Sequence, residues 1–159
     1  MPAGEKVSGI EQGVRGARSS ALRFLELLGA MKRYVREELA PPPERGMSEE
    51  KFRSLLGLKA LGSGSLKNLA AHDGLSASAQ CIMLDRLVAE GFALRSPDPE
   101  DRRRVRYELS EEGRSVLRSE IERRSAILTT QLARFSGAER ERFAAAVEVL
   151  LAALSRMEE

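Results

Sequence analysis

Hydrophobic residues recur every three or four positions over most of this chain, and every second position over two short stretches. The first spacing predicts amphipathic helices, and the second predicts half-buried strands. The helices are expected over residues 17–40, 48–61, 65–73, 76–90, 111–135 and 136–157, and the strands over residues 92–95 and 104–109. Residues 1–16 are polar, contain several glycines and lack either spacing, so we expect a mobile arm there.

Serines and glycines mark where the central helices begin and end. Ser65 and Ser76 are suited to cap helix N-termini, because a serine hydroxyl accepts a bond from a backbone N–H. Gly74 and Gly91 suit the left-handed conformation that often follows a helix end. Two helices joined by so short a connection form a helix-turn-helix, and the two strands after it form a hairpin, or wing. We therefore predict a mainly α fold with a small β-hairpin wing.

The hairpin is basic. Two prolines lie between its two expected strands, which places residues 98–103 at the tip. Residues 92–106 contain five arginines against three acidic residues. Arginines on a narrow projection can enter the minor groove of DNA, where the potential is most negative. We expect Asp101 to orient Arg103 by a bidentate pair.

The run GLSASAQCIMLDRLVAEGFALRSPDPEDRRRVRYELSEEG resembles the core of the MarR family of bacterial winged helix-turn-helix transcriptional regulators. The family's D-x-R wing signature falls on Asp101 to Arg103, and Leu109 to Gly113 match the family as well. The resemblance is clear over about residues 49–113 and weaker toward both ends. It implies a short strand near Gly64 that pairs with the wing.

The resemblance also implies a homodimer. The DNA-binding region would comprise residues 48–110, and the dimerisation helices would lie in residues 17–47 and 111–159. The first helix has a wide apolar stripe, which suits either such an interface or packing within its own subunit. A symmetric dimer presents two recognition helices about 34 Å apart, one turn of DNA, so we predict a pseudo-palindromic operator.

The side chains expected to contact double-stranded DNA lie on the second helix of the helix-turn-helix and on the wing. They are Ser76, Ser78, Gln80, Cys81, Ile82, Arg86, Arg95, Asp101, Arg102, Arg103 and Arg104. Gln80 departs from the family pattern, and it either pairs with adenine or is partly buried. Ile82 also departs from it, and either touches a thymine methyl group or leaves most of the binding to the wing. Arg86 either contacts phosphate or pairs with Asp85 or Glu90.

Composition excludes several classes of protein. The formal net charge of the 159 residues is +2, so a nucleic-acid surface must come from local clusters of charge. A single cysteine excludes an internal disulfide and fits a reducing cytoplasm. The resemblance implies that this is the cytoplasm of a bacterium, with the protein on the nucleoid when it is bound to DNA. No apolar run approaches the roughly 20 residues of a membrane span, and we expect neither a signal peptide nor a membrane partner.

No arrangement of residues predicts catalysis, a cofactor or a metal site. His72 is the only histidine, and one histidine with one cysteine does not make a convincing metal site. The sequence has no glycine-rich phosphate loop, and the acidic residues of the wing tip are a poor basis for paired-carboxylate chemistry. We therefore expect a protein that is not an enzyme.

The resemblance suggests a signal that controls DNA binding. MarR-like proteins often hold aromatic or phenolic ligands between their dimer helices and their DNA-binding region, which implies a repressor released by a small aromatic ligand or an oxidant. The residues expected to line a pocket, or else to form ordinary core, are Phe24, Tyr34, Phe52 and Phe135. Cys81 is either a redox-sensitive thiol or a plain small side chain. In an alternative function, the apolar pair Cys81 and Ile82 binds another protein and DNA binding is weakened.

Overall fold

The computed structural model describes residues 3–40, 47–99, 101 and 103–157, with side chains from residue 16 onward. Within these ranges the chain forms two compact units, residues 1–49 and 50–159. None of the described helices is long and apolar enough to cross a membrane.

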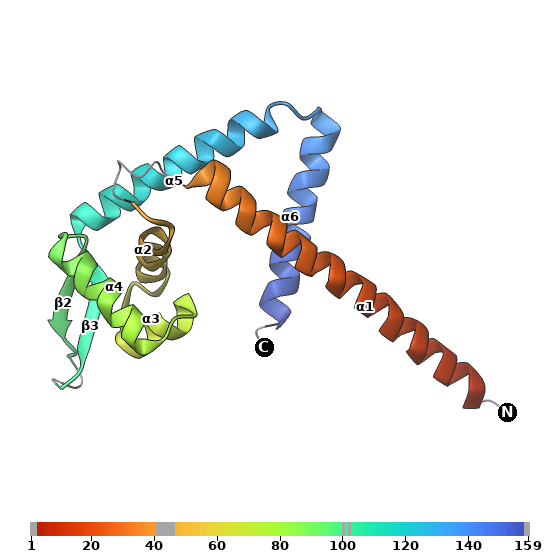
Figure 1. Cartoon of the computed structure of the whole chain (residues 1–159), viewed down its shortest axis with the longest axis horizontal. Helices are drawn as coiled ribbons and strands as arrows, with labels where there is room; N and C mark the ends of the chain where they lie inside the picture. The colour runs from red at the N-terminus through yellow and green to blue at the C-terminus, as the bar shows by residue number, and fades with distance from the viewer. Residues whose placement is uncertain (1–2, 41–46, 100, 102, 158–159) are drawn as a thin grey trace. The chain divides into compact units, whose positions relative to one another are not determined.

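The first unit is dominated by one long helix, α1 (Ala3–Tyr34), which continues into a π-helical turn, η1 (Val35–Leu39) (Figure 1). The helix begins at Ala3, well before its expected start at residue 17, so it includes most of the stretch for which we expected a mobile arm. Val7, Ile10 and Val14 are spaced at i, i+3 and i+7, and no proline interrupts residues 3–40. The helical spacing therefore extends into a stretch whose glycines had suggested otherwise.

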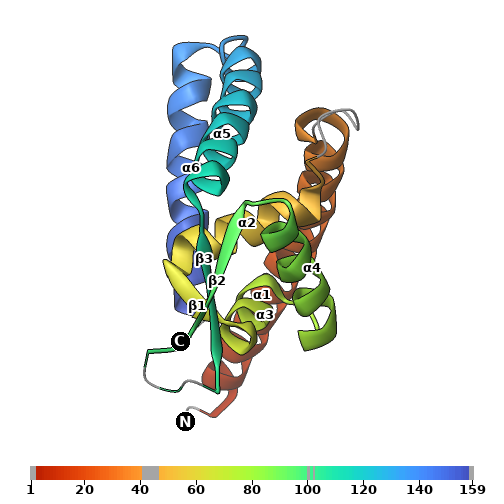
Figure 2. The ribbon, with the colours of Figure 1, turned by 90° about the vertical axis from the view of Figure 1, so that its left-hand side faces the viewer.

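The second unit contains a winged helix. Its elements along the chain are α2 (Glu49–Leu61), β1 (Ser63–Ser65), α3 (Leu66–Asp73), α4 (Ala77–Ala89), β2 (Ala93–Pro97) and β3 (Val105–Leu109). The strands form one antiparallel sheet in the order β1-β3-β2 (Figure 2). The expected strand near Gly64 is β1, and Gly64 pairs with Tyr107 of β3. The predicted fold class, mainly α with a small β-hairpin wing, is confirmed.

Leucines from four helices form the core of this unit. The fully buried leucines are Leu55 and Leu58 on α2, Leu69 on α3, Leu84 and Leu87 on α4, and Leu117 on α5 (Glu111–Leu132). Each contributes about 2 kcal/mol by removing apolar surface from water. In the sheet, Ala93 pairs with Leu109 and both are buried, whereas the larger Leu94 pairs with Glu108 and stays exposed.

Helix α5 packs by a different face from the one that its hydrophobic residues suggest. Its hydrophobic residues Val116, Ile121, Ile127, Leu128 and Leu132 are all only half-buried. The buried positions are Gly113, Leu117, Glu120 and Arg124, at i, i+4, i+7 and i+11. Two of these four residues are charged, so hydrophobic spacing does not mark this face.

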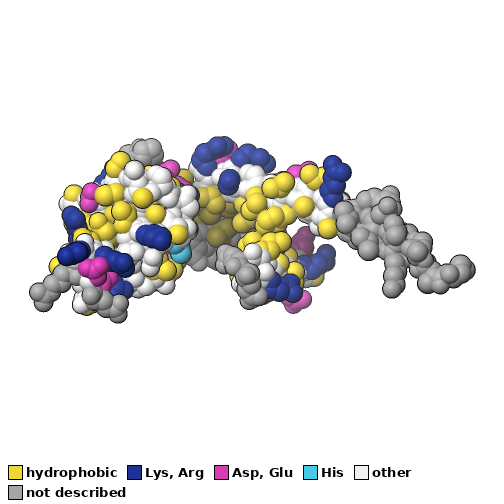
Figure 3. All heavy atoms as spheres, turned by 90° about the horizontal axis from the view of Figure 1, so that it is seen from below, with side chains coloured by type: hydrophobic (Ala, Val, Ile, Leu, Met, Phe, Trp, Pro, Cys, Tyr) yellow, Lys and Arg dark blue, Asp and Glu magenta, His cyan; other side chains and the backbone are white. Residues whose placement is uncertain are grey.

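Helices α1 and α6 (Gly137–Met157) expose hydrophobic side chains. Helix α6 begins at a capping box, in which Ser136 N donates to Glu139 Oε2 at 2.7 Å and Glu139 N donates to Ser136 Oγ at 3.3 Å. None of the residues of α6 is buried. On α1, Leu22 and Leu25 are more than half exposed, and Figure 3 shows hydrophobic side chains over the surface of both helices.

Candidate nucleic-acid interface

Local hydrogen bonds and one glycine set the geometry between α3 and α4. Ser65 Oγ and Ser76 Oγ each accept the backbone N–H three residues on, at 3.3 Å and 3.2 Å. Gly74 has a φ of +66°, which is unfavourable for residues with a side chain. The predicted helix-turn-helix is therefore present, with α4 as its second helix. The Ser76 hydroxyl is engaged in the cap, and Ser78, the other serine expected at DNA, is exposed.

Gln80 faces inward from α4 and joins it to α3. Its side chain is fully buried, and Nε2 donates to Asp73 Oδ2 at 3.0 Å. The other oxygen of this carboxylate lies 3.0 Å from His72 Nδ1. Gly57 of α2 makes room for the carboxylate, because a Cβ there would lie 2.5 Å from Asp73 Oδ1. Of the two alternatives for Gln80, burial is the one observed, and a buried amide that links two helices is not placed to pair with adenine.

The outward face of α4 is apolar at its centre. Ile82 is 72% exposed there. Cys81 beside it is half-buried, and its thiol donates to Asp85 Oδ2 at 3.6 Å. Arg86 is the only basic residue of α4, and its Nε donates to Glu90 Oε1 at 3.0 Å, one of the two salt bridges expected for it. The helix thus presents an isoleucine to its surroundings while its single cation is held by a carboxylate.

A buried lysine fixes the C-terminal end of α4. Lys51 of α2 is 3% exposed, and its Nζ lies 2.7 Å from Glu90 Oε2 and 5.8 Å from the centre of the Phe92 ring. Burial raises the pKa of Glu90, but the hydrogen bonds from Lys51 and Arg86 outweigh it, so the pKa lies below its ordinary value. These contacts link α2, the end of α4 and the residue before the wing. The sequence pattern did not mark Lys51 as buried.

Two aspartates shape the wing tip. Asp101 Oδ1 accepts the backbone N–H of Arg103 at 3.0 Å, and Asp101 Oδ2 lies 3.2 Å from Arg104 Nε. Asp98 Oδ1 accepts the backbone N–H of Asp101 at 3.3 Å, and Asp98 Oδ2 lies 3.8 Å from Arg106 Nε. The expected pair of Asp101 with the Arg103 guanidinium is therefore replaced by a pair with Arg104. The Arg103 side chain is exposed.

The base of the wing lies against α4. Arg95 of β2 is exposed and pairs in register with Tyr107 of β3. Burial raises the pKa of Tyr107, the charge of Arg95 lowers it, and the charges of Asp85 and Cys81 raise it. The pKa of Tyr107 lies above its ordinary value, and the contacts between α4 and β2 place the base of the wing beside the second helix of the helix-turn-helix. Arg102, another predicted contact, lies outside the described residues.

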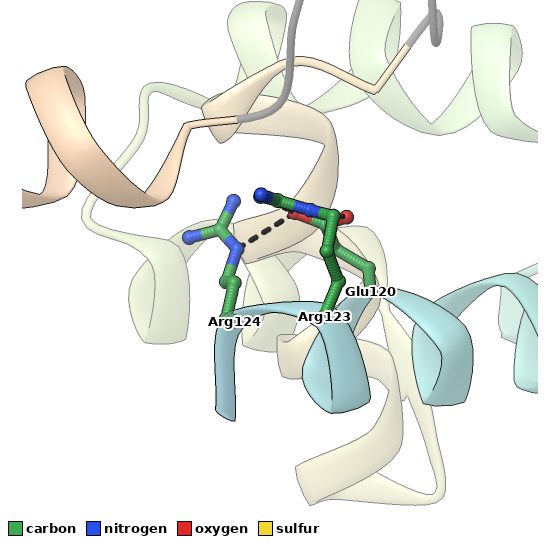
Figure 4. A network of polar contacts seen from close by, with 3 residues as sticks. All are labelled: Glu120, Arg123 and Arg124. Carbon is green, nitrogen blue, oxygen red and sulfur yellow. Dashed lines mark hydrogen bonds and ion pairs between the residues drawn. The ribbon is translucent and has the colours of Figure 1, made fainter. Parts of the chain in front are cut away.

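A largely buried ionic network of three residues lies on α5 (Figure 4), and one of its arginines contacts α2. The Glu120 carboxylate accepts bonds from Arg123 Nε and Nη2 at 2.9 Å and 2.8 Å, and from Arg124 Nε at 2.8 Å. The Arg124 guanidinium lies 3.7 Å from the centre of the Phe52 ring of α2. A run of charged residues on a long helix is usually solvated, so the sequence held no signal for this network.

The four aromatic residues expected to line a ligand pocket have different environments. Phe52 is covered by Arg124, and Phe135 packs edge to face on Phe143 at 6.4 Å between ring centres. Phe24 and Tyr34, in the first unit, are half-buried.

A cavity of about 410 Å³ opens between α2, β3 and α5, and no aromatic residue lines it. Its walls include Leu58, Leu109 and Leu117, and its basic residues are Lys59, Arg114 and Arg118. Among the described residues, no group of three or more His, Cys, Asp or Glu side chains is placed to hold a metal ion.

Several known proteins are similar to this chain in sequence and in fold. Residues 47–105 match the model of the MarR family. The HTH-type transcriptional regulator YwhA of Bacillus subtilis is 35% identical over 89 residues, which are 56% of this chain and 64% of that relative, or slightly less than two thirds of its length. The crystal structure of YusO from Bacillus subtilis is 25% identical, with a TM-score of 0.66 over 84% of this chain and 96% of that one. A mutant MarR from E. coli, 22% identical, has the same score over 83% and 93% of the two chains.

The fold and these likenesses define a winged helix-turn-helix protein. More specifically, residues 47–105 match the MarR family, and the resemblance found in the wing and in the second helix of the helix-turn-helix is confirmed.

Proposed function

We propose that this protein is a dimeric transcriptional regulator, a repressor in the bacterial cytoplasm, that binds double-stranded DNA with α4 in the major groove and the wing in the minor groove. The observation that carries the proposal is the exposure of Arg103 at the tip of a hairpin that Asp98 and Asp101 hold in shape. An exposed guanidinium on a preorganised projection suits the negative potential of a narrow groove. The exposed face of α4 continues this surface.

Exposed apolar surface on the terminal helices supports dimerisation. Leu151 and Leu154 of α6 are 55% and 40% exposed, and Leu22 and Leu25 of α1 are 55% and 62% exposed. On each of these helices, exposed apolar surface of this kind is more often covered by a partner than left in water. A two-fold dimer would present two copies of α4 to successive major grooves, which implies a pseudo-palindromic operator.

A small ligand or an oxidant would release the repressor. The cavity of about 410 Å³ combines leucine walls with Lys59, Arg114 and Arg118, and this combination suits a small aromatic anion better than the dispersed aromatic side chains do. The ligand would act by favouring a spacing of the two recognition helices that no longer matches one turn of DNA.

Cys81 would be the site of an oxidant's action, because it lies on the proposed DNA-binding helix.

Arg103→Ala is expected to weaken DNA binding about fivefold to tenfold at low salt, because it removes a cation from the groove. The slope of log K against log salt concentration should fall in magnitude by about one. Fluorescence anisotropy with DNA from upstream of the protein's own gene, and with a scrambled duplex, measures both quantities. Arg142→Ala on α6 removes the same charge from an exposed position outside the winged helix and should leave affinity for DNA nearly unchanged.

A second function, protein binding by a winged helix with weakened DNA recognition, is favoured by the 72% exposure of Ile82. The anisotropy titrations described above distinguish the DNA-binding function from the protein-binding function. Tighter and strongly salt-dependent binding to the upstream duplex supports a regulator. Weak and equal binding to both duplexes, with Arg103→Ala indistinguishable from wild type, would contradict the DNA-binding proposal at this site and favour a protein partner.

A further inference from the structure

The outward face of α4 offers few groups that can select a base. Ser78, Ile82 and Asp85 are exposed at i, i+4 and i+7, so they share one face of the helix. Ile82, at 72%, is more exposed than Leu94 and Leu61, the other large hydrophobic residues that the winged helix exposes within its described part. An isoleucine held in this position presents its branched side chain to whatever occupies the groove.

The long polar side chains of α4 are engaged elsewhere. Base selection in the major groove commonly uses arginine on guanine or glutamine on adenine. Here Gln80 is fully buried against Asp73, and Arg86 is held by Glu90 at 3.0 Å. The commonest bidentate pairings are therefore unavailable to this helix in the observed conformation. The feature of the groove that matches an exposed isoleucine is the methyl group on C5 of thymine.

The charge of the neighbouring carboxylate supports the same placement. Asp85 is exposed one turn after Ile82, and phosphates repel a carboxylate. Its favourable partners in the groove are the exocyclic amino groups of the bases, such as N4 of cytosine. Such a contact directs this face of α4 toward the groove floor, where the C5 methyl groups lie.

We propose that Ile82 is a specificity-determining residue that contacts the C5 methyl group of a pyrimidine, thymine or 5-methylcytosine, in each half of the operator. This inference rests on the proposed DNA-binding function. Unmethylated cytosine and uracil lack the methyl group, so the protein discriminates against both. One buried methyl group corresponds to about a fourfold difference in affinity, and two symmetric half-sites to about fifteenfold.

The test begins by selecting tight-binding duplexes from a random DNA pool with the full-length wild-type protein. Uracil then replaces, one at a time, each thymine of the selected half-site, symmetrically in both halves. At the thymine that Ile82 contacts, the replacement is expected to weaken wild-type binding about fifteenfold. A second pair of duplexes carries a C·G base pair in place of that T·A base pair, with the cytosine either unmethylated or methylated at C5. The methylated duplex is expected to bind more tightly than the unmethylated one by a similar factor.

Variants assign the effect to one side chain. Ile82→Ala should bind the thymine and uracil duplexes equally, and Ile82→Val should retain part of the difference. Because Ile82 is mostly exposed, these variants should keep the circular dichroism spectrum and unfolding midpoint of the wild type. Leu94→Ala, which shortens another exposed hydrophobic side chain, is the matched control and should keep the wild-type preference for thymine.

The outcomes separate the inference from the function on which it rests. A protein that selects a defined sequence but binds its thymine and uracil duplexes within twofold of each other overturns the inference and leaves the regulator intact. An unchanged thymine preference in Ile82→Ala also overturns it, because another residue would then read the methyl group. A protein that selects no sequence fails as a regulator at this site, and the inference fails with it.

Discussion

Gly113→Ala is expected to destabilise the winged helix by about 3 kcal/mol or more. A Cβ at residue 113 would lie 1.9 Å from the carbonyl oxygen of Phe92 and 2.9 Å from its carbonyl carbon. These atoms belong to the backbone and cannot rotate away. The first turn of α5 is also held to this segment by Ser110, whose N–H donates to Phe92 O at 3.1 Å and whose Oγ donates to Gly91 O at 2.6 Å. Relief of the clash would therefore separate α5 from the start of the wing.

Urea unfolding followed by circular dichroism measures this effect as a lower midpoint and a lower free energy of unfolding. The matched control is Gly137→Ala at the start of α6, where no atom lies within 4 Å of the added Cβ. This control should be neutral or stabilising by up to about 1 kcal/mol, because alanine is the better helix former. Equal midpoints for the two variants would contradict the close approach of α5 to Phe92.

Glu120→Ala is expected to lower the free energy of unfolding by about 3 kcal/mol, because it removes a buried carboxylate that accepts three hydrogen bonds from Arg123 and Arg124. Glu120 and Arg124 are each 7% exposed, and Arg124 also covers Phe52 of α2. Glu122→Ala, at an exposed position of the same helix, is the control and should change stability by less than about 0.5 kcal/mol. If both variants unfold at the same urea concentration, the network of Figure 4 does not stabilise the contact between α5 and α2.

Glu120 is also expected to make the stability of the folded protein sensitive to acid. Burial raises the pKa of Glu120, but hydrogen bonds from Arg123 and Arg124 outweigh it, so its pKa is lowered on folding. Its stabilising effect is therefore complete above about pH 4.3, the ordinary value for glutamate, and is lost as the pH falls through the lower folded value. Unfolding midpoints at pH 7, 5, 4 and 3 should fall less steeply for Glu120→Gln than for wild type. Parallel curves would show that this carboxyl does not titrate differently on folding.

Features that depend on near neighbours in the chain could be predicted from the sequence. The caps at Ser65 and Ser76 and the left-handed Gly74 and Gly91 lie where they were expected. Each depends on hydrogen bonds or steric contacts within a few residues, so the residue type decides the outcome locally. The spacing of hydrophobic residues, together with these caps and glycines, was sufficient to predict the order of the helices and of the two wing strands. The strand β1 was predicted only from the family resemblance.

The burial of polar residues could not be predicted in this way. Gln80, Lys51 and Glu120 are residue types that are usually exposed, and each is buried because a partner is brought to it by another turn or helix. Sequence spacing likewise did not reveal which face of α5 packs, because that face contains two charged residues. The sequence by itself determined the order of the helices, most of their ends and the class of fold, whereas the start of α1 lies well before the expected residue. The tertiary structure decided which side chains of α4 and the wing remain exposed, because burial depends on contacts between segments far apart in the chain.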